Sequence, residues 1–475
     1  MAASKKELIR EYTKAIRAGN AAVFAGAGLS RSSGLVDWKE LLRPLADEIG
    51  LDVDKETNLL TVAQYYKDSR NNRGGVNQAI LDAFSKDAVP NDNIKILSRL
   101  PIGTYWTTNY DHLIEDGIKG AERTADVKIY TRQLSKIKPG RDCIVYKMHG
   151  DVNDPDEAVL TREDYETYDK KRRLFSTALQ GDLISKIFLF IGFSFEDPNL
   201  MYMLGKIHSL LEESIHDHYC IFKKVSLNDC DNGEEFAYKT AKQELQIENL
   251  THYGIQSVLV DEYSEITDIL KDVETNLKRA NIFISGSANE YTTPWDEATA
   301  NKFAEKLSET LVHSGYRITT GFGLGIGSSI INGALNVIYS EKNQHIGEHL
   351  CMRPFPQNVK PEERQAKWKK YREDMLHDTG IAVFMFGNKW KENSKEEVVN
   401  ANGCWSEYEI AKEEKNLIIP IGSTGYMARE IYDDVREHID DYPYLQDYID
   451  ELGSETDIEK LVGLVVKIIS DQRVV

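Results

Sequence analysis

Two short polar segments carry residue types suited to proton transfer and ligand binding. Asn109 and Asp111 lie in Thr107-Thr-Asn-Tyr-Asp111, and His149 lies in Lys147-Met-His-Gly-Asp151. An imidazole can accept a proton near neutral pH, while a carboxamide and a carboxylate can hold a polar ligand or a water molecule. Each segment directly follows an apolar run. Singly, these residues could be turn, capping or structural residues, but together they indicate a site.

A third polar segment and a glycine-rich turn add to this pattern. Gly192-Phe-Ser-Phe-Glu-Asp-Pro198 follows the most apolar run of the chain, although Ser194 and Asp197 could simply cap the next helix. Gly26-Ala-Gly28-Leu-Ser30 follows another apolar run. Glycines let a backbone approach a phosphate closely, and the amides of such a turn can bind it. A tight connection without a ligand would have the same sequence.

The second half of the chain contains two more glycine-rich turns. Ser285-Gly-Ser-Ala288 and Gly321-Phe-Gly-Leu-Gly-Ile-Gly-Ser328 each separate an apolar run from a helical pattern. Two such turns in one unit suggest a nucleotide or an ADP-ribose-like ligand, and the alternative is a glycine-rich fold without one. Arg372 and Lys389 come later in the same half and could bind a phosphate. Glu407 could accept hydrogen bonds from ribose hydroxyls.

These segments need a framework of buried strands and covering helices. Short apolar runs alternate with amphipathic helical patterns, which predicts α/β structure with parallel sheets covered on both faces. A second strand–turn–helix start near residue 280 indicates two Rossmann-like parallel-sheet domains, residues 1–278 and 279–475. The predicted strands are 21–25, 103–107, 143–148, 187–192 and 219–222 in the first domain, and 282–284, 316–320, 381–386 and 417–421 in the second.

Composition restricts the partners that this chain can have. It has 475 residues and a formal net charge of −19, which disfavours general nucleic-acid binding. Five cysteines are scattered with no C-x-x-C spacing, which favours a reducing cytoplasm and disfavours a cysteine zinc site. Met1 to Leu8 lacks the apolar region of a signal peptide, and the longest apolar run is far too short for a membrane span.

The motifs GAGLS, TTNYD, KMHGD and GFSFEDP, in this order, resemble the sirtuin family of NAD-consuming proteins. The resemblance implies that the first domain is sirtuin-like and cleaves NAD+. It implies that Asn109, Asp111 and His149 are catalytic, with His149 as the general base. It also implies an NAD+-binding set that consists of Ala25, Gly26, Ala27, Ser30, Asp37, Thr108, Gly192 and Ser194.

Departures from the sirtuin pattern favour hydrolysis over deacylation. Sirtuin deacylases carry two cysteine pairs on a zinc ribbon, which this chain lacks, and no acyl-lysine-binding strand follows His149. The nicotinamide–ribose bond breaks through an oxocarbenium-like transition state. Asn109 would hold a water or the ribose hydroxyls, Asp111 would offset developing positive charge, and His149 would accept a proton. With water as acceptor, the products are nicotinamide and ADP-ribose.

The second half resembles the SLOG branch of Rossmann-like nucleotide sensors through GSA, GFGLGIGS, RPFP, YRxDM, GNK and SEY. The order of both halves resembles the NAD-degrading effector family of the Thoeris anti-phage system. This implies bacterial antiviral defence, in which a TIR-domain partner makes a cyclic ADP-ribose isomer that binds the SLOG domain and activates NAD+ hydrolysis. It also implies a homotetramer that assembles further, into a filament, on activation. The implied activator-binding residues are Gly286, Ser287, Ala288, Phe322, Leu324, Gly325, Arg372, Asn388, Lys389 and Glu407.

Other functions stay open at this point. An NAD-dependent protein deacylase would require an acyl-lysine substrate, and a catalytically silent nucleotide sensor would not need Asn109, Asp111 and His149. His345-Ile-Gly-Glu-His349 matches a metalloprotease pattern, but Gly347 interrupts it and no third ligand is evident. We therefore expect no metal, no zinc and no cofactor beyond NAD+ as substrate, and no nucleic-acid or membrane partner.

Overall fold

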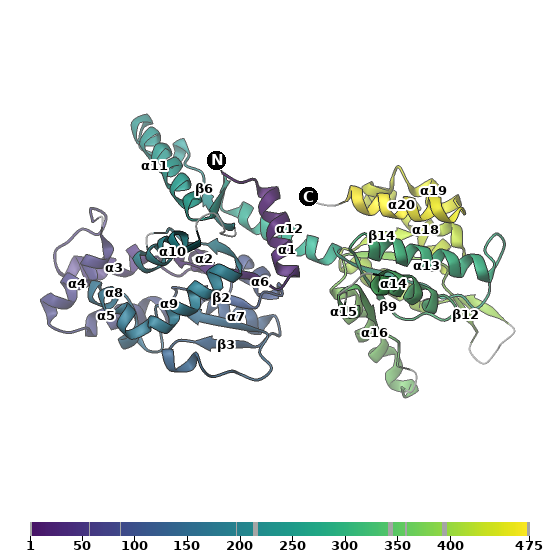
Figure 1. Ribbon diagram of the computed structural model, residues 1–475, viewed down its shortest axis with the longest axis horizontal. Helices are drawn as coiled ribbons and strands as arrows, with labels where there is room; N and C mark the ends of the chain where they lie inside the picture. The colour runs from purple at the N-terminus through teal and green to yellow at the C-terminus, as the bar shows by residue number, and fades with distance from the viewer. Residues whose placement is uncertain are drawn as a thin grey trace. The chain divides into compact units, whose positions relative to one another are not determined.

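The computed structural model describes residues 2–56, 58–85, 87–195, 197–211, 217–340, 345–356, 359–391 and 397–472. It forms two compact units, Met1–Glu274 and Thr275–Val474, each built on its own parallel sheet (Figure 1). The units divide within α12 (Ser264–Arg279), a few residues before the expected boundary. Glu196, in the third polar segment, lies outside the described residues. The predicted α/β class with two Rossmann-like sheets is confirmed.

The first unit contains a seven-stranded sheet in the order β3-β4-β2-β1-β5-β6-β7, and all neighbouring strands run parallel. The chain leaves β1 toward β2 and later returns to the other side of β1 at β5. This creates a topological switch point, where open α/β sheets bind ligands. The strands are β1 (Ala21–Ala25), β2 (Thr104–Thr107), β3 (Ala125–Lys128), β4 (Cys143–Lys147), β5 (Ile187–Ile191), β6 (His218–Lys223) and β7 (Ile255–Val260).

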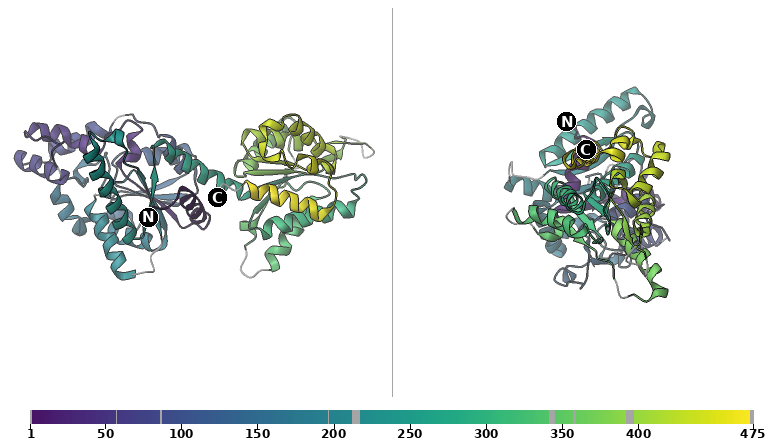
Figure 2. Two further views of the ribbon diagram at one scale, coloured as in Figure 1. Left: turned by 90° about the horizontal axis from the view of Figure 1, so that it is seen from above. Right: turned by 90° about the vertical axis from the view of Figure 1, so that its right-hand side faces the viewer.

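Apolar side chains explain the central place of β1 and β5. Every residue of β1 is buried, and Phe24, Phe188 and Phe190 share a core with α9 (Tyr168–Ser185) and α10 (Pro198–Leu211). Burial of such side chains is the main stabilising contribution to a covered sheet. Further helices of this unit, seen from two other sides in Figure 2, are α1 (Lys5–Arg17), α2 (Ala27–Arg31), α6 (Asp92–Arg99), α7 (Leu113–Gly120), α8 (Arg162–Glu166) and α11 (Gly233–His252).

A separate helical layer lies beside the carboxyl end of this sheet. It consists of α3 (Trp38–Glu48), α4 (Leu59–Arg70) and α5 (Gly74–Phe84). Its apolar residues pack with Tyr110 from the turn after β2 and with Val152 and Leu160 from the loop after β4. The layer therefore rests on the two segments that carry Asn109 and His149.

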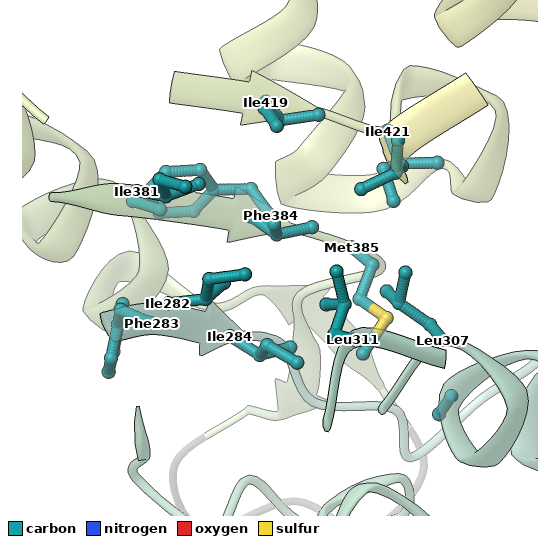
Figure 3. Packing of buried hydrophobic residues seen from close by; sticks show 14 of the residues in the cluster. Ile282, Phe283, Ile284, Leu307, Leu311, Ile381, Phe384, Met385, Ile419 and Ile421 are labelled. Atoms are coloured by element: carbon teal, nitrogen blue, oxygen red, sulfur yellow. The ribbon is translucent and has the colours of Figure 1, made fainter. Parts of the chain in front are cut away.

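The second unit contains a five-stranded parallel sheet in the order β10-β9-β8-β11-β14. Figure 3 shows its core, in which Ile284 and Met385 lie near Leu307 and Leu311 of α13 (Glu297–His313). The strands are β8 (Asn281–Ser285), β9 (Arg317–Thr320), β10 (Leu350–Met352), β11 (Ile381–Phe384) and β14 (Leu417–Pro420). The main helices are α14 (Gly327–Ser340), α16 (Pro361–His377), α17 (Asn402–Glu413), α18 (Tyr426–Glu437) and α20 (Ile458–Asp471).

Several elements were not expected from the sequence. They include the strands β3, β7 and β10 and the antiparallel hairpin of β12 (Asn388–Trp390) and β13 (Val398–Asn400). In the described part of the chain, no helix combines the length and the apolar character that crossing a bilayer requires.

Candidate functional site

The loops that follow β1 and β5 touch each other, and glycines make this possible. The amide of Gly26 donates to the carbonyl of Ile191 at 3.0 Å, and that of Gly28 to the carbonyl of Gly192 at 2.9 Å. Gly192 has a φ of 64°, and a Cβ there would stand 2.1 Å from the amide nitrogen of Leu29. These glycines thus close the switch point by direct backbone packing.

Three predicted site residues meet beside these loops. The Asn109 amide group donates to the Gly26 carbonyl at 3.1 Å and to Ser30 Oγ at 2.9 Å. Ser30 in turn donates to Asp111 Oδ2 at 2.8 Å, and the Leu113 amide donates to Asp111 Oδ1 at 3.0 Å. Both donor hydrogens of the Asn109 side-chain amide are therefore engaged, which fixes the orientation of this group. Its oxygen can then accept a hydrogen bond from a hydroxyl group or a water molecule.

His149 has a different set of neighbours. Its Nε2 lies 3.1 Å from Asp197 Oδ2, and both side chains are buried. Asp197 also accepts from the Tyr165 hydroxyl at 3.1 Å and from the Leu200 amide at 2.9 Å. Burial alone would raise the pKa of Asp197, but His149, the Leu200 amide and Tyr165 outweigh it and hold the pKa below its ordinary value. An ionised carboxylate thus lies beside the imidazole.

The remaining predicted NAD+-binding residues lie around this edge of the sheet or on neighbouring loops. Ala25 is the buried last residue of β1, Ala27 begins α2, and Thr108 follows β2. Asp37 caps α3 by accepting from the Glu40 amide at 3.0 Å. Ser194 is exposed on the loop after β5, so its side chain takes no part in the buried contacts described above.

A buried charged cluster that the sequence did not single out lies behind the Asn109–Asp111 turn. Lys147 Nζ is within 2.5 Å of Asp151 Oδ2 and 3.2 Å of Glu115 Oε1, and His112 Nε2 is 2.9 Å from both Asp151 oxygens. Burial alone would raise the pKa of Asp151, but His112 and Lys147 outweigh it and lower the pKa to about 2. Burial raises the pKa of Glu115 despite the nearby lysine.

In the second unit, Asn388 links two predicted segments. The completely buried Asn388 accepts from the amides of Asn289 and Glu290 at 2.7 and 3.1 Å, and Ser287 Oγ donates to its carbonyl at 2.8 Å. The turn after β8 also packs closely on the turn after β9, because a Cβ on Gly323 would stand 1.8 Å from the Gly286 carbonyl. Six of the predicted activator residues therefore lie in these turns: Gly286, Ser287, Ala288, Phe322, Leu324 and Gly325.

Arg372 and Glu407 contact each other rather than standing apart. Arg372 Nε lies 3.3 Å from Glu407 Oε1, Ser285 Oγ donates to Glu407 Oε2 at 2.6 Å, and the guanidinium lies 4.7 Å from the ring centre of Phe355. Burial raises the pKa of Glu407 although Arg372 opposes it. Of the predicted activator residues, Phe322, Leu324 and Lys389 are exposed.

Comparisons with known proteins bear on both units. A SIR2-like domain family matches residues 103–250, and the Sir2- and TIR-associating SLOG family matches residues 265–472. The chain is 44% identical to "NAD(+) hydrolase ThsA" of Bacillus cereus (strain MSX-D12) over 97% of each chain. It is also 44% identical to the protein of the same name from Cytobacillus dafuensis, over 100% of this chain and 98% of the relative. The chain belongs to the ThsA family.

The same name belongs to a relative from Acinetobacter baumannii (strain 532279), which is 43% identical over 95% of this chain and 96% of its own length. The ThsA family thus accounts for both units and their order. The resemblance to a sirtuin-like domain followed by a SLOG domain is confirmed by these matches.

Two features of this ThsA family member could have been found only with the fold in hand. Asp197 was expected at most as a helix cap, and it does cap α10, but it also faces His149 from a distant part of the chain. Lys147 lies two residues before His149 in sequence, yet its ammonium contacts the turn after β2 and Glu115 of α7 as well as the nearby Asp151. Among the residues that the structure describes, no group of three or more His, Cys, Asp and Glu side chains is placed to hold a metal ion.

Proposed function

We propose that this chain hydrolyses NAD+ to nicotinamide and ADP-ribose in the unit formed by residues 1–278. The nearly full-length similarity to proteins named NAD(+) hydrolase ThsA carries this proposal. It is supported by the buried Ser30–Asn109–Asp111 network and by the ionised carboxylate of Asp197 beside His149. The same sheet edge is where parallel α/β sheets bind nucleotides.

The chemistry follows from the groups present. As the bond between the nicotinamide nitrogen and ribose C1′ breaks, its electron pair leaves with nicotinamide and positive charge develops on the ribose. The Asn109 oxygen accepts a hydrogen bond from a ribose hydroxyl or from the attacking water. Asp111 stabilises the developing charge, and the water oxygen bonds to C1′. His149 accepts the released proton while Asp197 stabilises the imidazolium.

We further propose that residues 279–475 form a sensor for a nucleotide of the cyclic ADP-ribose type. A TIR-domain partner would supply the nucleotide. This association is supported by the match of the second unit to the Sir2- and TIR-associating SLOG family. On this proposal the protein acts in the cytoplasm in bacterial antiviral defence, as a homotetramer that assembles further when activated. Binding at the turns after β8 and β9 would switch on hydrolysis in the first unit.

The test measures NAD+ loss by the full-length protein with and without cyclic ADP-ribose isomers. We expect loss that requires one of these nucleotides and that falls by at least about 100-fold in Asn109→Ala and His149→Ala variants. His218→Ala is the matched control, since His218 is equally buried but lies at the start of β6, away from the three polar segments. Its activity per folded molecule should stay near that of the wild type.

Two results would contradict the proposal. NAD+ that stays intact with every cyclic isomer would contradict the proposed hydrolase activity. A requirement for an acylated lysine peptide would favour the deacylase instead.

A further inference from the structure

Lys147 is a completely buried lysine at the end of β4, beside the turn that carries Asn109 and Asp111. It pairs in register with Thr107, the last residue of β2. Its ammonium donates to the carbonyls of Tyr110 and Asp111 at 3.0 and 2.6 Å and to Asp151 Oδ2 at 2.5 Å. An ammonium has three hydrogens, so all of them are directed at defined acceptors.

Burying an ammonium group costs free energy. A buried ammonium requires compensating charge, which Asp151 and Glu115 supply from the loop after β4 and from α7. In return, one rigid group binds two consecutive backbone carbonyls. This fixes the two peptide planes on either side of the Asp111 Cα and so sets the direction of the Asp111 side chain, which Ser30 links to Asn109.

We propose that Lys147 is a positioning residue for the reaction: it holds the Asn109–Asp111 turn in the geometry that NAD+ cleavage requires, without contacting NAD+ itself. The effect on catalysis rests on the proposed function, whereas the effect on the turn does not. Two readouts separate these parts. Amide hydrogen exchange measures how stably the turn is held, and steady-state kinetics measure the rate of NAD+ cleavage.

A matched control exists on the neighbouring strand. Lys128 is the last residue of β3, is 3% exposed, pairs with Asp126 at 2.8 Å and donates to the Lys136 carbonyl. It therefore has the burial and pairing of Lys147 but no contact with the predicted site residues. Lys128→Met measures the general cost of losing a buried, paired lysine near a strand end.

The experiment compares Lys147→Met with Lys128→Met in the full-length protein. In Lys147→Met we expect the amides of Asn109 and Leu113 to exchange about tenfold faster or more, since both are hydrogen-bonded within the turn. With the activating nucleotide, kcat should fall about 100-fold while KM for NAD+ stays within roughly threefold. Lys128→Met should change neither the exchange in this turn nor kcat per folded molecule.

A second variant separates the loss of the lysine from misfolding caused by an unpaired buried charge. Lys147→Met combined with Asp151→Asn removes one charge of each sign, and it still leaves the Tyr110 and Asp111 carbonyls without their donor. It should show the same faster exchange and low kcat. Unchanged exchange in the turn would overturn the positioning role itself. Faster exchange with unchanged kcat would overturn its effect on catalysis, and a wild type that leaves NAD+ intact would contradict only the proposed function.

Discussion

The proposed base, His149, has its neighbouring carboxylate from a distant part of the chain. Asp197 reaches His149 from the start of α10, some fifty residues further along the chain, and Tyr165 donates to the same carboxylate oxygen that faces the imidazole. The negative charge of Asp197 attracts the positive charge that a proton transfer would place on the imidazole, which supports the proposed role of His149. The distance between the partners in sequence explains why only the fold reveals the pair.

Asp197→Asn tests this support directly. We expect kcat for NAD+ hydrolysis to fall at least tenfold, because the imidazolium formed during the reaction loses its negative partner. Tyr165→Phe keeps the ring beside His149 and removes only the hydroxyl, so its effect should be much smaller. Full activity in Asp197→Asn would argue against His149 as the base.

His112 gives a pH dependence whose sign can be worked out. Its hydrogen bond to Asp151 raises the pKa of His112 above the ordinary value of about 6.5. The stabilisation is therefore complete below about pH 6.5 and is lost as the pH rises through the raised pKa. Thermal unfolding midpoints should fall from pH 6 to pH 8.5, and less so in His112→Gln. The difference should be modest because the side chain is about one-third exposed.

The separate residues of the first site could largely be found from the sequence, because each follows an apolar run. Asn109 and Asp111 could be placed at one sheet edge with Ser30, and the hydrogen bonds among them agree with that placement. Lys147 could not, because a lysine in a polar segment ordinarily faces solvent. Nor could the contact of Arg372 with Glu407, which depends on how α16 and α17 pack.

At the scale of elements, the contact between the loops after β1 and β5 depends on glycines, and Gly192 is the most constrained of them. Gly192→Ala combines a positive φ with a Cβ placed 2.1 Å from the Leu29 nitrogen, so backbone has to move. Gly140 has a similar φ of 68° but open space around its Cβ. Chemical denaturation should therefore show Gly192→Ala to be about 2 kcal/mol or more less stable than Gly140→Ala. Equal losses would mean that the loops separate easily.

The strands that the sequence revealed are those with continuous apolar residues, such as Ile187–Ile191. β3 was missed because Asp126 and Lys128 occupy it as a buried ion pair, which interrupts the apolar pattern. β10 was missed because it has only three residues.

At the scale of the whole molecule, we propose that each of the two units binds a nucleotide, which would allow a ligand of the second unit to control the reaction in the first. Lys389, exposed on β12, is the clearest test of the second unit. Lys389→Ala should raise the activator concentration for half-maximal NAD+ hydrolysis about tenfold or more, through loss of a charge-assisted hydrogen bond, and leave the maximal rate unchanged.

Lys391 is the matched control for this prediction, because it lies two residues further on and pairs with Glu397 at 2.6 Å. Lys391→Ala should leave the activation curve in place. Equal shifts in both variants would point to general electrostatics, and an unchanged curve in Lys389→Ala would remove this residue from the sensor.

The central place of β1 has a consequence for how the protein is made. Ala21 pairs with Ile187, so the strand emerges from the ribosome 166 residues before its partner in β5. At bacterial translation rates of about 5–20 residues per second, that interval lasts roughly 8–33 s. A nascent or prematurely terminated chain that ends before β5 lacks one neighbour of its central strand and the entire Asp197 segment. Products that end before β5 therefore lack part of the edge at which we propose NAD+ is cleaved.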